Sequence, residues 1–158
     1  MKDILTVLIT GTLLLFQVSA GAHEPITGPT PFGEPGKPSQ VDRVIKVDMK
    51  SMRFDPNRIK VSTGETIRFV ITNSDPIDHE FVIGDAAFQD LHRKEMVQMA
   101  QMGHVMTHVD SNAVTVGAGQ TGKLIWTFSR EGRFEIDCNI EGHFEAGMSA
   151  IVDVGPAN

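Results

Sequence analysis

Apolar and polar side chains alternate through most of the chain after Val41. The alternation is clearest over residues 45–49, 59–61, 67–71, 124–128 and 134–136. Period-two alternation is typical of strands that bury one face, and turns rich in Gly, Pro, Asn and Asp separate these runs. Several short strands joined by frequent turns predict an all-β domain over residues 41–158, built as a Greek-key β-sandwich or barrel.

Residues 86–102 depart from this pattern, because they contain good helix formers and neither Gly nor Pro. Their larger apolar side chains recur near helical spacing: Leu91, Met96, Met99 and Met102. We therefore expect a short helix inserted between strands. It should end near Gly103 and continue into an irregular Met- and His-rich loop that reaches Asn112. Side chains at this spacing more often cover a core than bind a cofactor, and Leu91 would then pack on the sandwich.

The first 22 residues have the pattern of an export signal. A short polar start precedes an apolar run of 13 residues, Ile4–Phe16, and small residues precede two alternative cleavage positions, after Ala20 or after Ala22. The run is too short to span a bilayer comfortably, so we expect a periplasmic protein without stable membrane insertion. Residues 23–40 contain five prolines and three glycines, which predicts an extended tether without regular secondary structure.

Composition narrows the classes of function. The 158 residues carry a formal net charge of −6 and include one tryptophan and no tyrosine. Without a basic patch or an aromatic stacking platform, we expect no nucleic-acid partner. Cys138 is the one cysteine of the sequence, so an intrachain disulfide and a CxxC zinc site are ruled out. A single cysteine in an exported protein calls for a chemical explanation.

The residues that follow Cys138 suggest one. Cys138 is in phase with Phe134 and Ile136, which places it on the buried side of its strand. His143 and Met148 lie within the same 11-residue segment, 138–148. Thiolate, imidazole and thioether together select copper among the available metals. The plainer alternatives are that the cysteine is a small core residue and that Met148 belongs to the apolar strand after it.

A second imidazole is available upstream. His79 is in phase with Phe81 and Ile83, so it also faces inward. Two histidines and one cysteine in a trigonal set, with a weak axial methionine, form the copper site of electron-transfer proteins.

These residues resemble the cupredoxins, the family of plastocyanin, azurin and related blue or green copper proteins. The similarity runs from about Val41 to Val154. It includes the upstream residues Phe54-Asp55-Pro56, Ile59, Val61, Gly64, Asn73 and His79-Glu80-Phe81. Small periplasmic cupredoxins of bacterial copper tolerance are especially similar, since they share a Met/His-rich insertion. The resemblance implies one type 1 copper per chain, with four ligands: His79, Cys138, His143 and Met148.

The resemblance also implies a function in one-electron transfer, in periplasmic copper tolerance, or in both. Its partner would be a redox protein such as a cytochrome, or copper ions and copper-handling proteins. A copper buffer or chaperone, or a cuprous oxidase, is the alternative. We expect no other enzyme activity, because six histidines are too few for a further trinuclear copper cluster. Glu80 and Glu141 stand where many members have Asn and Pro, which leaves redox potential and colour open.

The inserted segment offers further soft ligands for a possible second Cu(I) site: His92, Met96, Met99, Met102, His104, Met106 and His108. Core packing is the simpler explanation for the methionines of the helix. After cleavage at Ala22, His23 could also chelate copper through its amine and ring. Six acidic residues near the ligands would form a solvated rim or attract a basic redox partner: Asp75, Asp78, Glu80, Asp137, Glu141 and Glu145.

Overall fold

The computed structural model describes residues 25–103 and 110–157. The predicted export signal, His23 and the loop residues His104, Met106 and His108 therefore lie outside the described residues. Within the described part of the chain, no helix is long and apolar enough to cross a membrane.

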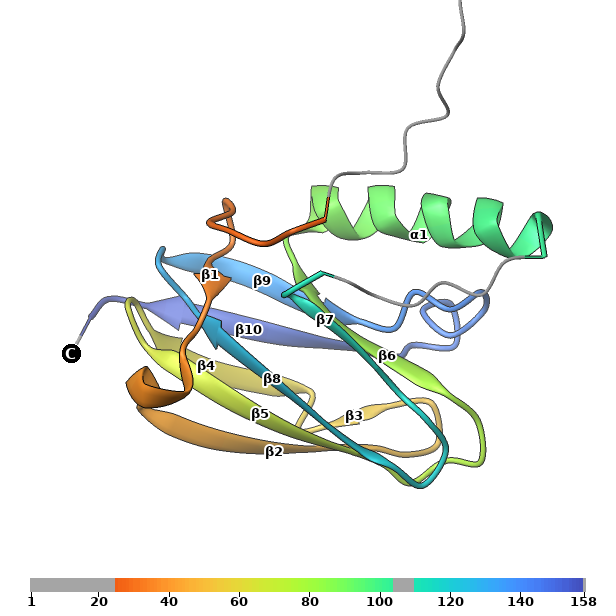
Figure 1. The fold of residues 1–158 in the computed structure, drawn as a ribbon, viewed down its shortest axis with the longest axis horizontal. Helices are drawn as coiled ribbons and strands as arrows, with labels where there is room; N and C mark the ends of the chain where they lie inside the picture. The colour runs from red at the N-terminus through yellow and green to blue at the C-terminus, as the bar shows by residue number, and fades with distance from the viewer. Residues whose placement is uncertain (1–24, 104–109, 158) are drawn as a thin grey trace, which may run out of the picture.

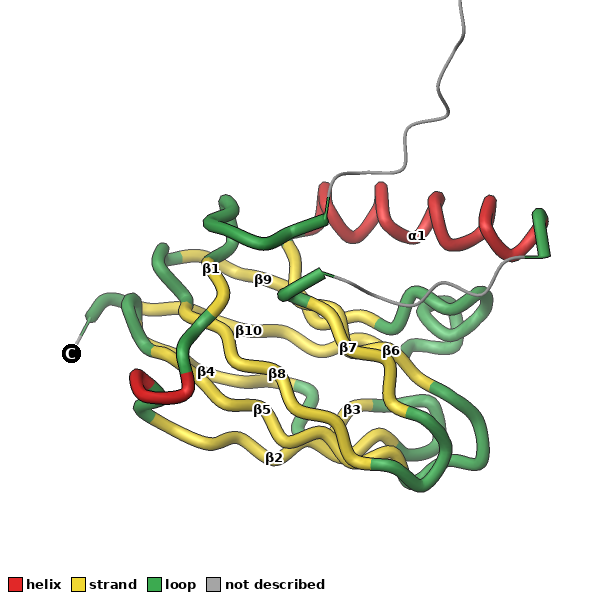
Figure 2. Tube along the Cα trace, viewed as in Figure 1, coloured by secondary structure: helices red, strands yellow, loops and turns green. Residues whose placement is uncertain are grey.

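Two five-stranded sheets form the molecule (Figures 1 and 2). The first sheet has the strand order β1-β8-β5-β2-β3, and the second has the order β4-β10-β9-β6-β7. The strands of the first are β1 (Glu34–Pro35), β2 (Arg43–Met49), β3 (Phe54–Asp55), β5 (Thr66–Asn73) and β8 (Thr121–Thr127). Those of the second are β4 (Arg58–Ser62), β6 (His79–Gly84), β7 (Ala113–Val116), β9 (Gly132–Asp137) and β10 (Ser149–Gly155).

The alternating apolar positions fill the space between the sheets, as the sequence predicts. Ile67, Phe69 and Trp126 from the first sheet and Phe134 and Ile136 from the second are all buried in one core cluster. The all-β sandwich with one short helix is thus confirmed, and the burial of these side chains accounts for the period-two pattern.

Strand β10 lies in the interior of the second sheet. It pairs parallel with β4, where Gly155 faces Ser62, and antiparallel with β9, where Ser149 faces Asp137. The loop between β9 and β10 therefore leaves and re-enters the sheet at one edge of the sandwich, and its two ends are adjacent.

The segment expected to be a tether without secondary structure is partly ordered against the domain. It contains β1 and the 3-10 turn η1 (Pro38–Gln40), and Phe32 is buried. The ring of Phe32 stacks on Trp126 at 5.8 Å between centroids and contacts Phe88 at 5.2 Å. The indole N–H of Trp126 donates to the carbonyl of Phe32. An aromatic residue among the prolines is enough to dock the segment, because it covers apolar surface that would otherwise face water.

Helix α1 (Ala86–Gln101) lies where the sequence predicts it, alongside β6 and β9 (Figure 1). Asp85 caps its first turn by accepting from the N–H of Phe88. The predicted buried stripe is wrong in part, because Leu91 is 54% exposed and Met102 is 62% exposed. The helix instead buries Gln89 and His92.

Polar contacts explain this choice of face. The amide nitrogen of Gln89 donates to the carbonyl of Val82 at 2.8 Å, and its oxygen accepts from the side chain of Asn139 at 2.9 Å. The helix thus meets backbone carbonyls and a loop, where hydrogen bonds are needed, rather than an apolar sheet face.

Candidate metal centre

The structure brings together three of the four predicted ligands as one compact group. His79 begins β6, Cys138 directly follows β9, and His143 lies in the β9–β10 loop. The Nδ1 atoms of the two histidines are 3.1 Å apart, and the sulfur of Cys138 lies 3.2 Å from Nδ1 of His143 and 4.0 Å from Nδ1 of His79. Among the described residues, this is the one group of three or more His, Cys, Asp or Glu that could hold a metal ion.

The size of this triangle fits a metal ion. A point equidistant from corners separated by 3.1, 3.2 and 4.0 Å lies about 2 Å from each corner, close to the lengths of metal bonds to imidazole nitrogen and thiolate sulfur, roughly 2.0–2.3 Å. Two neutral imidazole nitrogens and one cysteine sulfur, which binds a metal ion as the thiolate, suit a soft metal. The donor set therefore fits copper.

Met148 is buried and directly precedes β10. Its backbone N–H donates to the carbonyl of His143 at 3.0 Å, and its own carbonyl accepts from the N–H of Cys138 at 3.2 Å. The loop is thus closed on itself by the backbone of Met148, the residue predicted as the axial ligand.

The orientation of His79 is set by Asp75. The Nε2–H of His79 donates to Oδ2 of Asp75 at 3.0 Å, since a carboxylate can only accept. This bond fixes the tautomer and leaves the Nδ1 lone pair free for a metal. Asp75 also accepts from the backbone N–H groups of Ser51 and Met52, at 2.7 and 3.0 Å. The hydrogen bond from Met52 is the main reason that the pKa of Asp75 lies below its ordinary value of 3.8.

The loop that carries Asp75 is held by Asn73. The buried amide of Asn73 donates to the carbonyls of Ile77 and Val116, at 2.7 and 2.9 Å, and its oxygen accepts from the N–H of Asp75. Residues 74–78 therefore fold back in a fixed turn before His79. Sequence reasoning placed Asn73 in a family pattern and Asp75 on an acidic rim, and neither hydrogen-bonding role was predicted.

Cys138 is fully buried. Its sulfur accepts from the backbone N–H of Glu80 at 3.3 Å. This hydrogen bond comes from the backbone, so it does not depend on whether the residue after His79 is Glu or Asn. Burial raises the pKa of Cys138 from 9.0 to about 12. The thiol therefore keeps its proton at neutral pH until a metal ion displaces it.

His143 is half-buried and is the most exposed of the four predicted ligands. Burial, followed by the electrostatic influence of the neighbouring His79, lowers the pKa of His143 below the ordinary value of 6.5. The ring is therefore neutral at pH 7 and can offer a lone pair.

The predicted acidic rim is wrong for two of its members. Glu80 and Asp137 are buried, and Asp137 forms an ion pair with Arg93. Three others are exposed, as expected: Asp78, Glu141 and Glu145. Alternation along β6 places Glu80 on the face opposite His79, which sequence reasoning takes to be exposed. All six residues of β6 are buried, because both faces of this interior strand are covered.

The described candidates for the predicted second site differ in their exposure to solvent. His92 is buried, Met96 and Met99 are half-buried, and Met102 is exposed. The remaining three candidates, in the loop after α1, lie outside the described residues.

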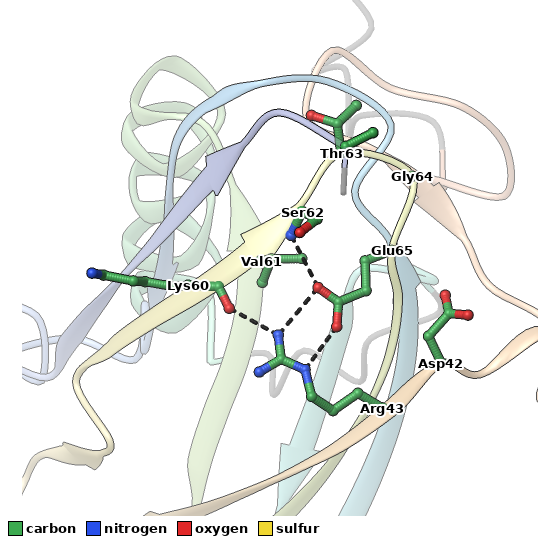
Figure 3. A pocket seen from close by; sticks show the side chains of 9 residues that line it. Asp42, Arg43, Lys60, Val61, Ser62, Thr63, Gly64 and Glu65 are labelled. Atoms are coloured by element: carbon green, nitrogen blue, oxygen red, sulfur yellow. Dashed lines mark hydrogen bonds and ion pairs between the residues drawn. The ribbon is translucent and has the colours of Figure 1, made fainter.

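A surface groove lies at the other end of β10 from this metal centre, where Gly155 pairs with Ser62 (Figure 3). The guanidinium of Arg43 donates to both carboxylate oxygens of Glu65, at 2.7 and 3.1 Å, and to the carbonyl of Lys60. Glu65 also accepts from the N–H of Ser62. The charges of Arg43 and Glu65 are therefore satisfied by each other and by the neighbouring backbone.

Comparison with known proteins places these observations in context. Residues 8–148 match the family described as Cupredoxin-like domain. A copper-resistant cuproprotein CopI of Rubrivivax gelatinosus is 46% identical, with 82% of this chain and 76% of that protein covered. Its namesake in Pseudomonas aeruginosa is 39% identical, with 90% and 92% covered. The solved structure of auracyanin B has a TM-score of 0.63 at 17% identity, covers 81% of this chain and 97% of its own, and supports the fold alone.

Proposed function

This chain belongs to the cupredoxin family and its cofactor is copper, and we propose that it is an exported type 1 copper protein of periplasmic copper tolerance. In this proposal a copper ion held by the chain would supply one-electron redox chemistry between Cu(II) and Cu(I), with a redox protein such as a cytochrome as electron partner. The relatives named copper-resistant cuproproteins support the link to tolerance.

One observation carries the proposal. Two imidazole nitrogens and the sulfur of Cys138 converge within 4.0 Å of one another at the end of the sandwich where the β9–β10 loop lies. We assign His79, Cys138 and His143 as the residues that would hold the copper ion most strongly, and Met148 as a weaker fourth ligand. Copper held in this way supplies one-electron redox chemistry, and a ligand geometry between the preferences of Cu(II) and Cu(I) limits reorganisation.

The chain's own groups prepare this site. Asp75 holds His79 with Nδ1 directed inward. The N–H of Glu80 stabilises the negative sulfur once the proton of Cys138 has left. The half-buried ring of His143 lies nearest to solvent among the ligands, so it is the natural point of electron entry and exit.

The substitution Cys138→Ala tests the assignment. Wild type loaded with Cu(II) should be strongly coloured by thiolate-to-copper charge transfer, with one type 1 copper per chain in metal counts and EPR spectra. The variant should lose the colour, because its sulfur donor is gone, while the emission of the buried Trp126 shows that the sandwich remains folded. A folded variant that keeps the charge-transfer band would refute the assignment.

A second candidate function is Cu(I) buffering on the inserted segment, and the exposure of Met102 favours it. A methionine that is 62% exposed contributes little to a core, and a thioether is a ligand for Cu(I). On this account wild type binds more than one Cu(I) per chain, and Met102→Ala lowers that number without changing the type 1 colour. The exposed Leu91 on the same helix provides the control, Leu91→Ala. A titration of wild type that ends at one Cu(I) per chain would exclude this function.

A further inference from the structure

Arg93 joins helix α1 to both ends of the segment that bears two of the proposed ligands. One guanidinium nitrogen donates to Oδ2 of Asp137 at 3.1 Å. The carbon at the centre of the guanidinium lies 3.5 Å from the centroid of the Phe144 ring. The side chain is only 15% exposed and that of Asp137 is fully buried. The contact is therefore internal and is shielded from solvent.

The two partners of Arg93 are direct neighbours of proposed ligands. Asp137 is the last residue of β9 and precedes Cys138, and Phe144 follows His143 in the loop. One planar group thus contacts the chain on each side of the segment 138–143. In Figure 1 the C-terminal half of α1 lies beside the loop that joins β9 to β10.

The chemistry of this contact requires arginine. A buried carboxylate is stable only when it is paired, and the fully buried Asp137 is paired with Arg93 at 3.1 Å. A guanidinium can stack on a ring with its face and donate to a carboxylate with its edge at the same time, and a lysine ammonium cannot. The second pair made by Arg93, with the largely exposed Asp90 on its own helix, is of the weak surface kind.

We propose that Arg93 is a positioning residue through which helix α1 holds the ligand loop in its metal-binding arrangement. The helix inserted between β6 and β7 is then a structural part of the metal centre. This inference deepens the proposed function and rests on it for the identity of the metal, whereas the hold on the loop can be tested without metal.

The first test uses the metal-free protein and its one cysteine. Arg93→Met removes the charge and the planar group but keeps an unbranched side chain that favours helix, and Lys94→Met makes the same exchange at the exposed neighbouring position. We expect an aromatic disulfide reagent to label Cys138 roughly tenfold faster in Arg93→Met than in wild type, because the loop opens more often. Lys94→Met should match wild type.

The second test uses the copper-loaded protein. Arg93→Met should shift the charge-transfer band and the EPR hyperfine splitting, and should weaken copper binding by about 10–100-fold, as loss of groups that orient ligands does. Arg93→Lys should lie between wild type and Arg93→Met, since it restores the charge but not the simultaneous contact with both partners.

The results distinguish a failure of the proposed copper function from a failure of the positioning role of Arg93. If wild type fails to take up one copper per chain, the proposed function is wrong, and the labelling rates of the metal-free variants still decide the role of Arg93. Labelling rates and spectra of Arg93→Met equal to those of Lys94→Met would overturn the role of Arg93. Should Arg93→Met alter the emission of Trp126 and so report a general loss of structure, Arg93→Lys decides. A labelling rate of Arg93→Lys between those of wild type and Arg93→Met supports the inference, and a rate equal to that of wild type overturns it.

Discussion

Asp75 connects the imidazole of His79 with a backbone turn that lies 24 residues earlier in the chain. In that turn Ser51 and Met52 have φ angles of 54° and 58°, a left-handed conformation that costs L-residues energy. Both donate their N–H groups to the same carboxylate that accepts from His79. A single side chain therefore stabilises an unfavourable turn and orients a ligand.

Asp75→Asn should lower the affinity for Cu(II) by about 10–100-fold and raise the reduction potential. The neutral amide makes His79 a less basic ligand, and a less basic ligand stabilises Cu(II) less. Competition titrations and redox potentiometry measure the two effects. Asp78→Asn is the control, since Asp78 accepts from the N–H of Ala118 rather than from a ligand. If the two variants behave alike, Asp75 does not tune the site.

Strands β9 and β10 act together as the frame of the metal centre. Six residue pairs join them, from Ser149 opposite Asp137 to Val154 opposite Gly132. The ligand loop spans the open end of this ladder and is tied across its base by the N–H of Cys138. Stability of the two strands is therefore a condition for the geometry of the site.

Glu135, in the middle of β9, makes the stability of the strand pair β9–β10 depend on pH. Burial, followed by the charge of Asp137, raises the pKa of Glu135 above its ordinary value of 4.5. A raised folded-state pKa means that ionisation opposes folding, so this contribution favours the folded state at low pH and is lost as the pH rises through the folded-state pKa. Glu135→Gln should therefore be more stable than wild type at pH 7, by at most about 0.5 kcal/mol because solvent screens a partly exposed carboxylate, and equal to it near pH 3.5.

Urea unfolding at the two pH values checks this expectation, with the exposed Glu131→Gln in the neighbouring turn as control. Near pH 3.5 the side chain at position 135 is neutral in both wild type and Glu135→Gln. A gain in stability of the variant that persists at this pH would therefore contradict the electrostatic cause.

At the scale of the whole molecule, an aromatic cluster joins three parts of the chain. Phe32 comes from the N-terminal segment, Trp126 from the first sheet and Phe88 from helix α1. The rings of Phe88 and His92 are stacked at 5.7 Å, which continues the cluster along the helix. Within α1 this cluster therefore reaches His92, the neighbour of Arg93, which contacts Asp137 and Phe144.

Phe32→Ala should destabilise the protein by about 3 kcal/mol, because it removes a buried ring and leaves a cavity. The emission of Trp126 should move to longer wavelength as water reaches the indole. Copper stoichiometry should remain one per chain, since the ligands lie elsewhere. Thermal unfolding and fluorescence measure the effect against Pro31→Ala, an exposed neighbour. A loss of stability no larger than that of Pro31→Ala would show that the segment is not part of the core.

The sequence was sufficient wherever local periodicity determines burial. Period two located β2, β5, β8 and β9 and placed His79 and Cys138 on inward faces, because the direction of a strand side chain follows from its phase. It was insufficient where a distant partner decides. The buried face of α1 is polar because it meets Val82 and Asn139, and Asp75 and Arg93 gain their roles from residues far away in the chain. No local pattern reports such pairings.

The interior position of β10 also determines when the protein can acquire its metal. A chain is made and delivered from its N-terminus, so β4 and β9 emerge first and remain without the strand that must lie between them. Cys138, His143 and Met148 emerge immediately before β10, and the loop that carries them closes only when that strand is inserted. We therefore expect an incomplete chain to lack a closed ligand loop, so that capture of copper would follow completion of the chain.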